Sequence, residues 1–277
     1  MRVPYIKAMK VISFNPLNYY CKIPPLATDS KEIVELILKY LMWFFPSVTE
    51  METLQNLKYY IQQDQGHYLF FKEGKCFASC FDPYEFLCHL RGLVERHIMD
   101  VCPNDAQLFH GSAVVNNGVC LCILAPSGCG KSSLAFGLCQ HGWEYVADDL
   151  LLLHDDMIQK IPLPIEFRKG IEIDSHFCSY QLGDGIGEKD IYVLPLTDAT
   201  IDKIFIVVLI KSDSSTSLRK MTAGEAYVSL LDNLKVTFSS TTFLRSILHT
   251  AKKHPAYSLS NCNMYEALSL LDNLKNE

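Results

Sequence analysis

The feature that most constrains this chain is the segment from Leu121 to Leu134, LCILAPSGCGKSSL. An apolar run leads into a glycine-containing loop, and Lys131 then opens a helical pattern. A strand, a glycine loop and a helix in this order are typical of the phosphate loop of nucleotide-binding proteins. Ala125 stands where that pattern has its first glycine, so we expect a slightly more open entry to the loop.

Physical chemistry explains why this segment suits phosphate. Successive backbone N–H groups of the loop can point into one concavity, and the helix N-terminus adds partial positive charge. Lys131 would reach the outer phosphates, and the Ser132 hydroxyl would bind Mg²⁺. The predicted nucleotide-binding residues are Ser127, Gly128, Cys129, Gly130, Lys131, Ser132 and Ser133. The alternative is a glycine-rich turn with an exposed lysine.

Composition limits the function classes. The chain has 277 residues, enough for one large domain or two small ones, and a net charge of −6 that gives no electrostatic reason to expect nucleic acid or an anionic membrane as partner. Eleven cysteines occur without a CxxC pair, and we see no signal-peptide pattern. We therefore expect reduced thiols and a cytoplasmic protein.

The order of patterns predicts an α/β fold in two regions. Residues 1–100 form an expected α+β region, with helices over Ile33–Phe45, started by a capping box from Asp29 to Glu32, and from Pro83 to about Met99. Between these helices, His67–Phe71 and Cys76–Cys80 are predicted strands. We found no catalytic motif in this region.

Residues 101–277 are the expected nucleotide-binding domain. Its predicted strands cover 112–115, 119–124, 143–153 and 203–211, and the first two form a hairpin. Three helices are expected near the C-terminus, two of them capped by Thr222 and Asn263. The segment Ser229–Lys235 recurs unchanged as Ser269–Lys275, which we interpret as two similar helix ends.

Two adjacent acids, Asp148 and Asp149, lie inside the predicted strand 143–153. Burying them is costly unless a positive group meets them. Since neighbouring residues of a strand face opposite sides, both reach one site only at a strand end or bulge. One carboxylate would then bind Mg²⁺ and the other would face the substrate. The alternative is a single metal-binding acid beside a spare one.

Three further residues are candidates for the site. Glu166 and Arg168, two apart on an extended segment, could bind a second metal and grip phosphate; a surface ion pair is the competing interpretation. His110 could hydrogen-bond an active-site aspartate, although a lone histidine is more often structural.

Four segments in this order resemble the kinase domain of the HPr kinase/phosphorylase family: His110–Val115, Ala125–Ser133, Gly142–Asp149 and Pro164–Gly170. They look most similar to its HPr-kinase-related branch, some members of which phosphorylate precursor peptides in lasso-peptide pathways. The resemblance covers roughly residues 100–277. It implies a phosphoenolpyruvate-carboxykinase-like fold, ATP and Mg²⁺ as cofactors, and a serine hydroxyl of a peptide or small protein as acceptor.

The resemblance also implies roles for single residues. Lys131 and Ser132 would hold phosphate and Mg²⁺, Asp148 would be the catalytic base with His110 as its partner, and Asp149 would be a metal ligand. Glu166, a metal ligand, and Arg168, a nucleotide-binding residue, fall at the family's signature. That signature departs from the bifunctional enzymes, since it reads Glu-Phe-Arg-Lys-Gly instead of Glu-x-Arg-Gly-x-Gly.

The sequence thus favours an ATP-dependent kinase acting on a serine of a peptide or small protein, such as the precursor of a ribosomally made natural product. Two alternatives remain open: a nucleotide-binding switch or scaffold without phosphoryl transfer, and a kinase of small-molecule hydroxyls. The oligomeric state, a homo-oligomer included, is not determined by these patterns.

Overall fold

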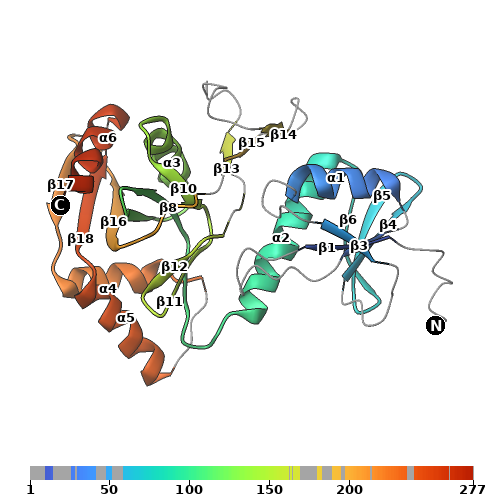
Figure 1. The fold of residues 1–277 in the computed structure, drawn as a ribbon, viewed down its shortest axis with the longest axis horizontal. Coiled ribbons are helices and arrows are strands. Elements are labelled where there is room, and N and C mark those ends of the chain that lie inside the picture. The colour runs from blue at the N-terminus through green and yellow to red at the C-terminus, as the bar shows by residue number, and fades with distance from the viewer. Residues whose placement is uncertain are drawn as a thin grey trace. The chain divides into compact units, whose positions relative to one another are not determined.

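A computed structural model gives the structure of the chain. It describes residues 10–14, 26–28, 30–41, 48–51, 59–161, 163, 165–168, 180–182, 189–194, 197–212, 214–235, 240–261 and 263–276. The chain divides into two compact units (Figure 1): the first comprises Met1–Cys102 with Leu182–Gly187, and the second Pro103–Gln181 with Glu188–Glu277.

The first unit combines a six-stranded sheet with two helices. The strand order is β3-β1-β2-β4-β5-β6. The strands are β1 (Lys10–Phe14), β2 (Leu26–Thr28), β3 (Val48–Met51), β4 (Tyr59–Asp64), β5 (His67–Lys72) and β6 (Lys75–Cys80), and the helices are α1 (Lys31–Leu41) and α2 (Pro83–Val101). Both predicted strands and both predicted helices of this region are present, and residues 42–45 of the predicted helix 33–45 lie outside the described residues.

Turn chemistry explains the hairpins of this unit. Glu73 and Gly74 both have positive φ, 49° and 78°, and join β5 to β6 by a tight turn. At the start of α1, the Ser30 hydroxyl accepts a hydrogen bond from the Ile33 amide at 3.4 Å. The predicted cap at Asp29 lies outside the described residues.

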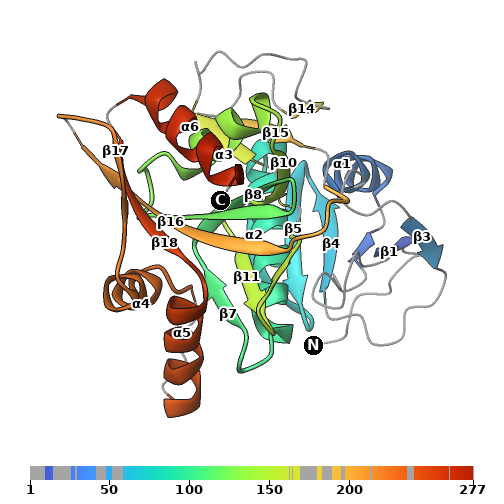
Figure 2. The same ribbon diagram turned by 60° about the vertical axis from the view of Figure 1, so that its left-hand side comes forward.

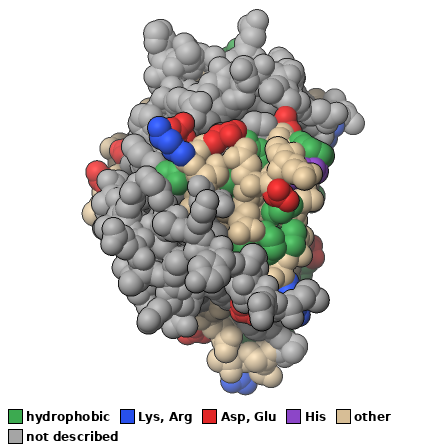
Figure 3. Space-filling view, turned by 90° about the vertical axis from the view of Figure 1, so that its right-hand side faces the viewer, with side chains coloured by type: hydrophobic (Ala, Val, Ile, Leu, Met, Phe, Trp, Pro, Cys, Tyr) green, Lys and Arg blue, Asp and Glu red, His purple; other side chains and the backbone are tan. Residues whose placement is uncertain are grey.

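The surface of the first unit has a hollow of about 260 Å³ between the sheet and α2. Tyr59 and Leu93 form part of its lining, with Lys72 and Arg96 beside them. Figure 3 shows that hydrophobic and acidic side chains lie next to one another on the face that it displays. Phe77 and Phe81 are among the large apolar residues exposed in this unit, at 43% and 65%.

The second unit is built on a mixed six-stranded sheet in the order β10-β8-β9-β16-β18-β17. Its strands are β8 (Gly111–Asn116), β9 (Val119–Leu124), β10 (Glu144–Ala147), β16 (Lys203–Lys211), β17 (Ser217–Lys220) and β18 (Ala256–Asn261). β16 pairs in parallel with β9 and β18, whereas the β8–β9, β8–β10 and β17–β18 pairs are antiparallel. The predicted hairpin and the strand 203–211 are confirmed.

The described residues also form two small three-stranded sheets, in the orders β12-β11-β7 and β13-β15-β14. They comprise β7 (Gln107–Phe109), β11 (Leu151–His154), β12 (Met157–Gln159), β13 (Ile165–Arg168), β14 (Tyr180–Leu182) and β15 (Lys189–Val193). The prediction of one strand over 143–153 is wrong. β10 ends at Ala147, and β11 pairs with β7 and β12 in a different sheet.

Helices cover both faces of the large sheet (Figures 1 and 2). They are α3 (Lys131–Gln140), α4 (Ala223–Asp232), α5 (Thr241–Lys253) and α6 (Met264–Asp272), and a 3₁₀ turn, η3 (Asn273–Asn276), follows. One apolar cluster joins α3 and α6 to one face, and a second joins α4 and α5 to the other. β9, at the centre, is buried along its whole length, as expected for a strand covered on both sides.

The three C-terminal helices begin at side-chain caps. Thr222 and Glu225 form a capping box, Ser240 accepts from the Phe243 amide, and Asn263 accepts from the Tyr265 amide. The predicted caps at Thr222 and Asn263 are thereby confirmed. None of the helices within the described ranges is long and apolar enough to cross a membrane.

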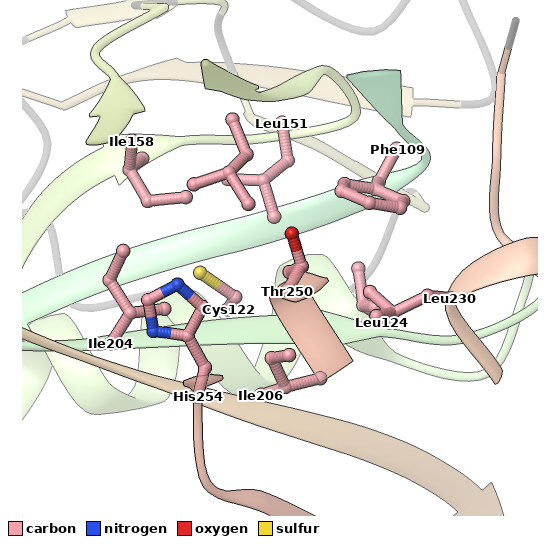
Figure 4. Close-up of a pocket in the computed structure, with 11 residues that line it drawn as sticks. Phe109, Cys122, Leu124, Leu151, Ile158, Ile204, Ile206, Leu230, Thr250 and His254 are labelled. Carbon is pink, nitrogen blue, oxygen red and sulfur yellow. The ribbon is translucent and has the colours of Figure 1, made fainter. Parts of the chain in front are cut away.

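The α4–α5 side of the core contains a small cavity of about 10 Å³, room for about one water molecule (Figure 4). Apolar side chains such as Phe109, Leu124 and Ile206 line it, together with Thr250 and His254. His254 is 8% exposed, and its Nε2 has no hydrogen-bond partner among the described residues. Burial lowers the pKa of the His254 imidazole from its usual value, because a charged ring is poorly solvated there.

This burial predicts a pH-dependent stability. The folded-state pKa of His254 lies below the unfolded value, so the unfolded chain binds the proton more tightly and the folded state loses stability as pH falls through and below about 6.5. When the pH is lowered from about 7.5 to about 5.5, we expect the melting temperature of His254→Leu to fall less than that of the parent chain. Equal losses in both proteins would contradict this, and His67→Gln in the other unit is the control.

Candidate functional site

The glycine loop connects the carboxyl end of β9 to the start of α3. Gly128 and Gly130 have φ of 81° and 92°, conformations that glycine adopts without strain. Gly130 is the N-terminal cap of α3, and Lys131 is its first residue. A side-chain Cβ at either glycine would meet no atom within 4 Å. Among the described residues, no atom therefore crowds the loop beside these two glycines.

The N-terminus of α3 differs from the other helix starts of this unit. Within the described residues, no side chain caps α3, whereas Thr222, Ser240 and Asn263 cap α4, α5 and α6. The first amides of an α-helix have no partner inside the helix. At α3 these donors thus remain available for an anion, and the helix dipole favours one there.

Lys131 is held inside the loop. Its Nζ donates to the carbonyl oxygens of Ala125, at 2.9 Å, and Pro126, at 3.2 Å. The residue is 5% exposed, and burial lowers the pKa of its ammonium, while the nearby carboxylates of Asp149 and Asp148 act in the opposite direction. The loop thus surrounds a cation, which is the charge that phosphate groups need. Ala125 itself is fully buried in the apolar cluster beneath α3.

Asp148 faces the helix start directly. The Ser132 hydroxyl lies 3.0 Å from each oxygen of the Asp148 carboxylate, and the Ser112 hydroxyl donates to Oδ1. Asp148 is 2% exposed, so these hydroxyls replace water around its charge. A serine hydroxyl beside a carboxylate, both next to the glycine loop, is an oxygen-donor pair of the kind that Mg²⁺ prefers.

Asp149 points to a different set of partners. His110 Nε2 lies 2.8 Å from Asp149 Oδ1, and Lys235 Nζ lies 4.0 Å from Oδ2. The family resemblance implied that His110 pairs with Asp148 and that Asp149 is the metal ligand. The structure pairs His110 with Asp149 and Ser132 with Asp148, and the base and metal-ligand roles of the two acids stay predictions.

The backbone explains how two adjacent acids serve one site. β10 ends at Ala147, after a register shift against β8 between Tyr145 and Ala147. Asp149 then adopts a left-handed conformation with φ of 66°. The kink turns successive side chains away from simple alternation, as the requirement for a strand end or bulge predicted.

The other predicted residues fall into two groups. Ser127 and Gly128 are exposed, and Cys129, Gly130 and Ser133 are partly buried, all along the loop and the first helical turn. Glu166 and Arg168 lie on β13, which packs beside α3 through Ile165 and Phe136. The structure does not describe the side chains of Glu166 and Arg168, so their predicted roles stay predictions.

Sequence reasoning missed two residues of the site, Ser112 and Lys235. Ser112 was visible as a polar residue in the apolar strand β8, which is a signal for a buried polar contact. Lys235 had no local signal, because it comes from a segment far along the chain. Within the described part of the chain, no group of three or more His, Cys, Asp or Glu side chains could hold a metal ion.

Comparisons with known proteins give little beyond this geometry. No family model matches the chain, and no curated protein matches it. Among solved structures, the Hpr(Ser) kinase/phosphatase from Coxiella burnetii is similar over 61% of this chain and 90% of that chain, at 14% sequence identity and a TM-score of 0.33. At this level of similarity, function has to be argued from the site itself.

The loop geometry predicts a measurable cost for a side chain at Gly130. Gly130→Ala meets no steric contact but forces alanine into a left-handed conformation, so we expect a loss of about 1 kcal/mol in unfolding free energy. Gly224→Ala, in the first turn of α4, is the matched control and is expected to be neutral or stabilising. Urea unfolding of both variants measures the difference; equal stability changes would exclude the strained loop.

Proposed function

We propose that this protein is an ATP- and Mg²⁺-dependent kinase that transfers the γ-phosphoryl group to a hydroxyl. The observation that carries the proposal is the placement of Asp148 against Ser132 at the uncapped start of α3. A phosphate loop alone binds nucleotide. A carboxylate held on the loop's serine adds the ligand set that brings Mg²⁺ to the phosphates, and Asp149 adds a second carboxylate for the acceptor.

The contacts suggest how the acids divide their roles. Ser132 and Asp148 would hold Mg²⁺, directly or through water, because both offer oxygen ligands and lie together. Bound there with the nucleotide, Mg²⁺ supplies charge neutralisation for the phosphate oxygens. Asp149 is the proposed base, with His110 2.8 Å from one of its carboxylate oxygens and Lys235 4.0 Å from the other. This assignment exchanges the roles of Asp148 and Asp149 that the family resemblance implied.

The reaction follows from these positions. The acceptor hydroxyl loses its proton to Asp149 as its oxygen forms a bond to the γ-phosphorus. The bond from that phosphorus to the bridging oxygen breaks, and the electron pair leaves with ADP. Lys131 and the loop amides neutralise the negative charge that spreads over the phosphate oxygens. We extend the proposal to a serine of a peptide or small protein as the acceptor, on the motif order from His110 to Gly170.

Nucleotide binding is the first test. Lys131→Ala removes the cation that the loop encloses, and we expect ATP affinity to fall by about tenfold or more, as for the loss of a charged hydrogen bond. Isothermal titration with ATP and Mg²⁺ measures it. Unchanged affinity in a folded variant would remove the loop from nucleotide binding.

Catalysis is the second test. Asp149→Asn should keep nucleotide affinity near that of the parent chain but lower phosphoryl transfer by about a hundredfold or more, because amide oxygen is a far weaker base. The matched control is Asp155→Asn. Asp155 belongs to a second pair of adjacent acids, Asp155 and Asp156, and its side chain is 82% exposed. Mass spectrometry of a serine-containing peptide library incubated with ATP measures the product.

The outcome also separates the kinase from a nucleotide-binding switch. A chain that binds ATP but yields no phosphorylated peptide or small molecule would favour the switch. Equal activity of Asp149→Asn and the parent chain would remove Asp149 as the base.

A further inference from the structure

The residues that follow α4 are joined by a backbone bridge to the segment that leads into His110. Phe109 and Leu234 form an antiparallel bridge. On its two sides, the His110 amide donates to the Asn233 carbonyl and the Lys235 amide donates to the Leu108 carbonyl, both at 2.8 Å. These bonds fix Lys235 relative to β7, and hence relative to His110.

The bridge directs the Lys235 side chain toward the acid pair. Residues directly opposite one another in an antiparallel pair share a face, and so do residues two apart in one strand. Lys235 and His110 thus project to the same side. Their ends flank the Asp149 carboxylate, with His110 at 2.8 Å from one oxygen and Lys235 at 4.0 Å from the other.

Charge shows what this lysine can add. Asp148 and Asp149 bring two negative charges to a place where a triphosphate must approach. Lys131 is one cation of the site, and Lys235, 4.0 Å from the Asp149 carboxylate, is a second. The Lys235 side chain is 21% exposed, so its charge is only partly screened by water.

The contact of Lys235 with Asp149 is longer than that of His110 with the same carboxylate. At 4.0 Å the contact is an ion pair without hydrogen-bond geometry, unlike the 2.8 Å contact from His110. A lysine has a flexible stem and three donors, so its ammonium can reach a new anion near Asp149 without moving the bridge.

We propose that Lys235 is a second phosphate-binding cation, which contacts the γ-phosphoryl oxygens from the acceptor side, opposite Lys131. The proposal rests on the proposed kinase function. In the transfer step, the acceptor proton still passes to Asp149 and the electron pair of the broken bond leaves with ADP. Lys235 stabilises the charge on the phosphoryl group that moves between them.

The experiment compares nucleotides that differ in the γ-phosphate. Lys235→Gln and Lys235→Arg are titrated with ADP and with a non-hydrolysable ATP analogue, each with Mg²⁺. We expect Lys235→Gln to bind the ATP analogue about tenfold more weakly, a loss the size of one charged contact. Its affinity for ADP should be unchanged. Lys235→Arg should retain most of the parent chain's difference in affinity between the ATP analogue and ADP.

The chain supplies a closely matched control. Lys275 ends the second copy of the same seven-residue segment and binds Asp272 at the end of α6, at 2.8 and 2.7 Å. Lys275→Gln should leave both affinities unchanged.

The outcomes separate this inference from the proposed function. If the affinities of folded Lys235→Gln for the two nucleotides change equally, or not at all, the γ-phosphate contact is overturned. Lys235 would then be a residue that positions His110 and Asp149. The kinase proposal would then still stand on the loop. If the parent chain binds neither nucleotide, both proposals fail together.

Discussion

The site depends on one buried carboxylate and the hydroxyls around it. Removing a carboxylate from water costs on the order of several kcal/mol unless other groups solvate it. Asp148 meets this cost through Ser112 on β8 and Ser132 on α3. The same contacts tie the end of β10 to a strand and to the helix that opens from the glycine loop. An apolar residue at any of the three positions would remove at least one of the hydrogen bonds around the buried carboxylate.

The large sheet explains why the loop and the acids meet. β8 runs antiparallel to both β9 and β10, so β9 and β10 point the same way and their carboxyl ends lie at the same edge. Ligands of open α/β sheets bind at this edge. Apolar layers under α3 and α6 on one face, and under α4 and α5 on the other, hold β9 and β16 in place beneath it.

Much of this arrangement was predictable from local patterns. The run 119–124, the glycines after it and Lys131 identify a strand, a loop and a helix start, because each depends on nearby residues alone. The caps at Thr222 and Asn263 were predictable for the same reason. The break after Ala147 was not: the apolar residues on both sides read as one strand, and only the pairing of β11 with β7 separates them.

Tertiary pairing also decides which residues reach the acids. The partner of His110 depends on a left-handed backbone at Asp149, which no pattern in the sequence marks. The repeated segment makes the same point. In both copies the helix ends at the aspartate, Asp232 or Asp272. Yet Lys275 returns to its own helix end, while Lys235 joins the site, because only the first copy meets β7.

The left-handed backbone of Asp149 has a consequence for how such a chain can change. An aspartate tolerates this conformation better than most residues, but glycine adopts it without strain. Glycine at position 149 would therefore relieve the backbone strain, but it would also remove the carboxylate that is proposed as the base. At position 149, the substitution that would favour stability is the one that would remove the proposed catalytic group.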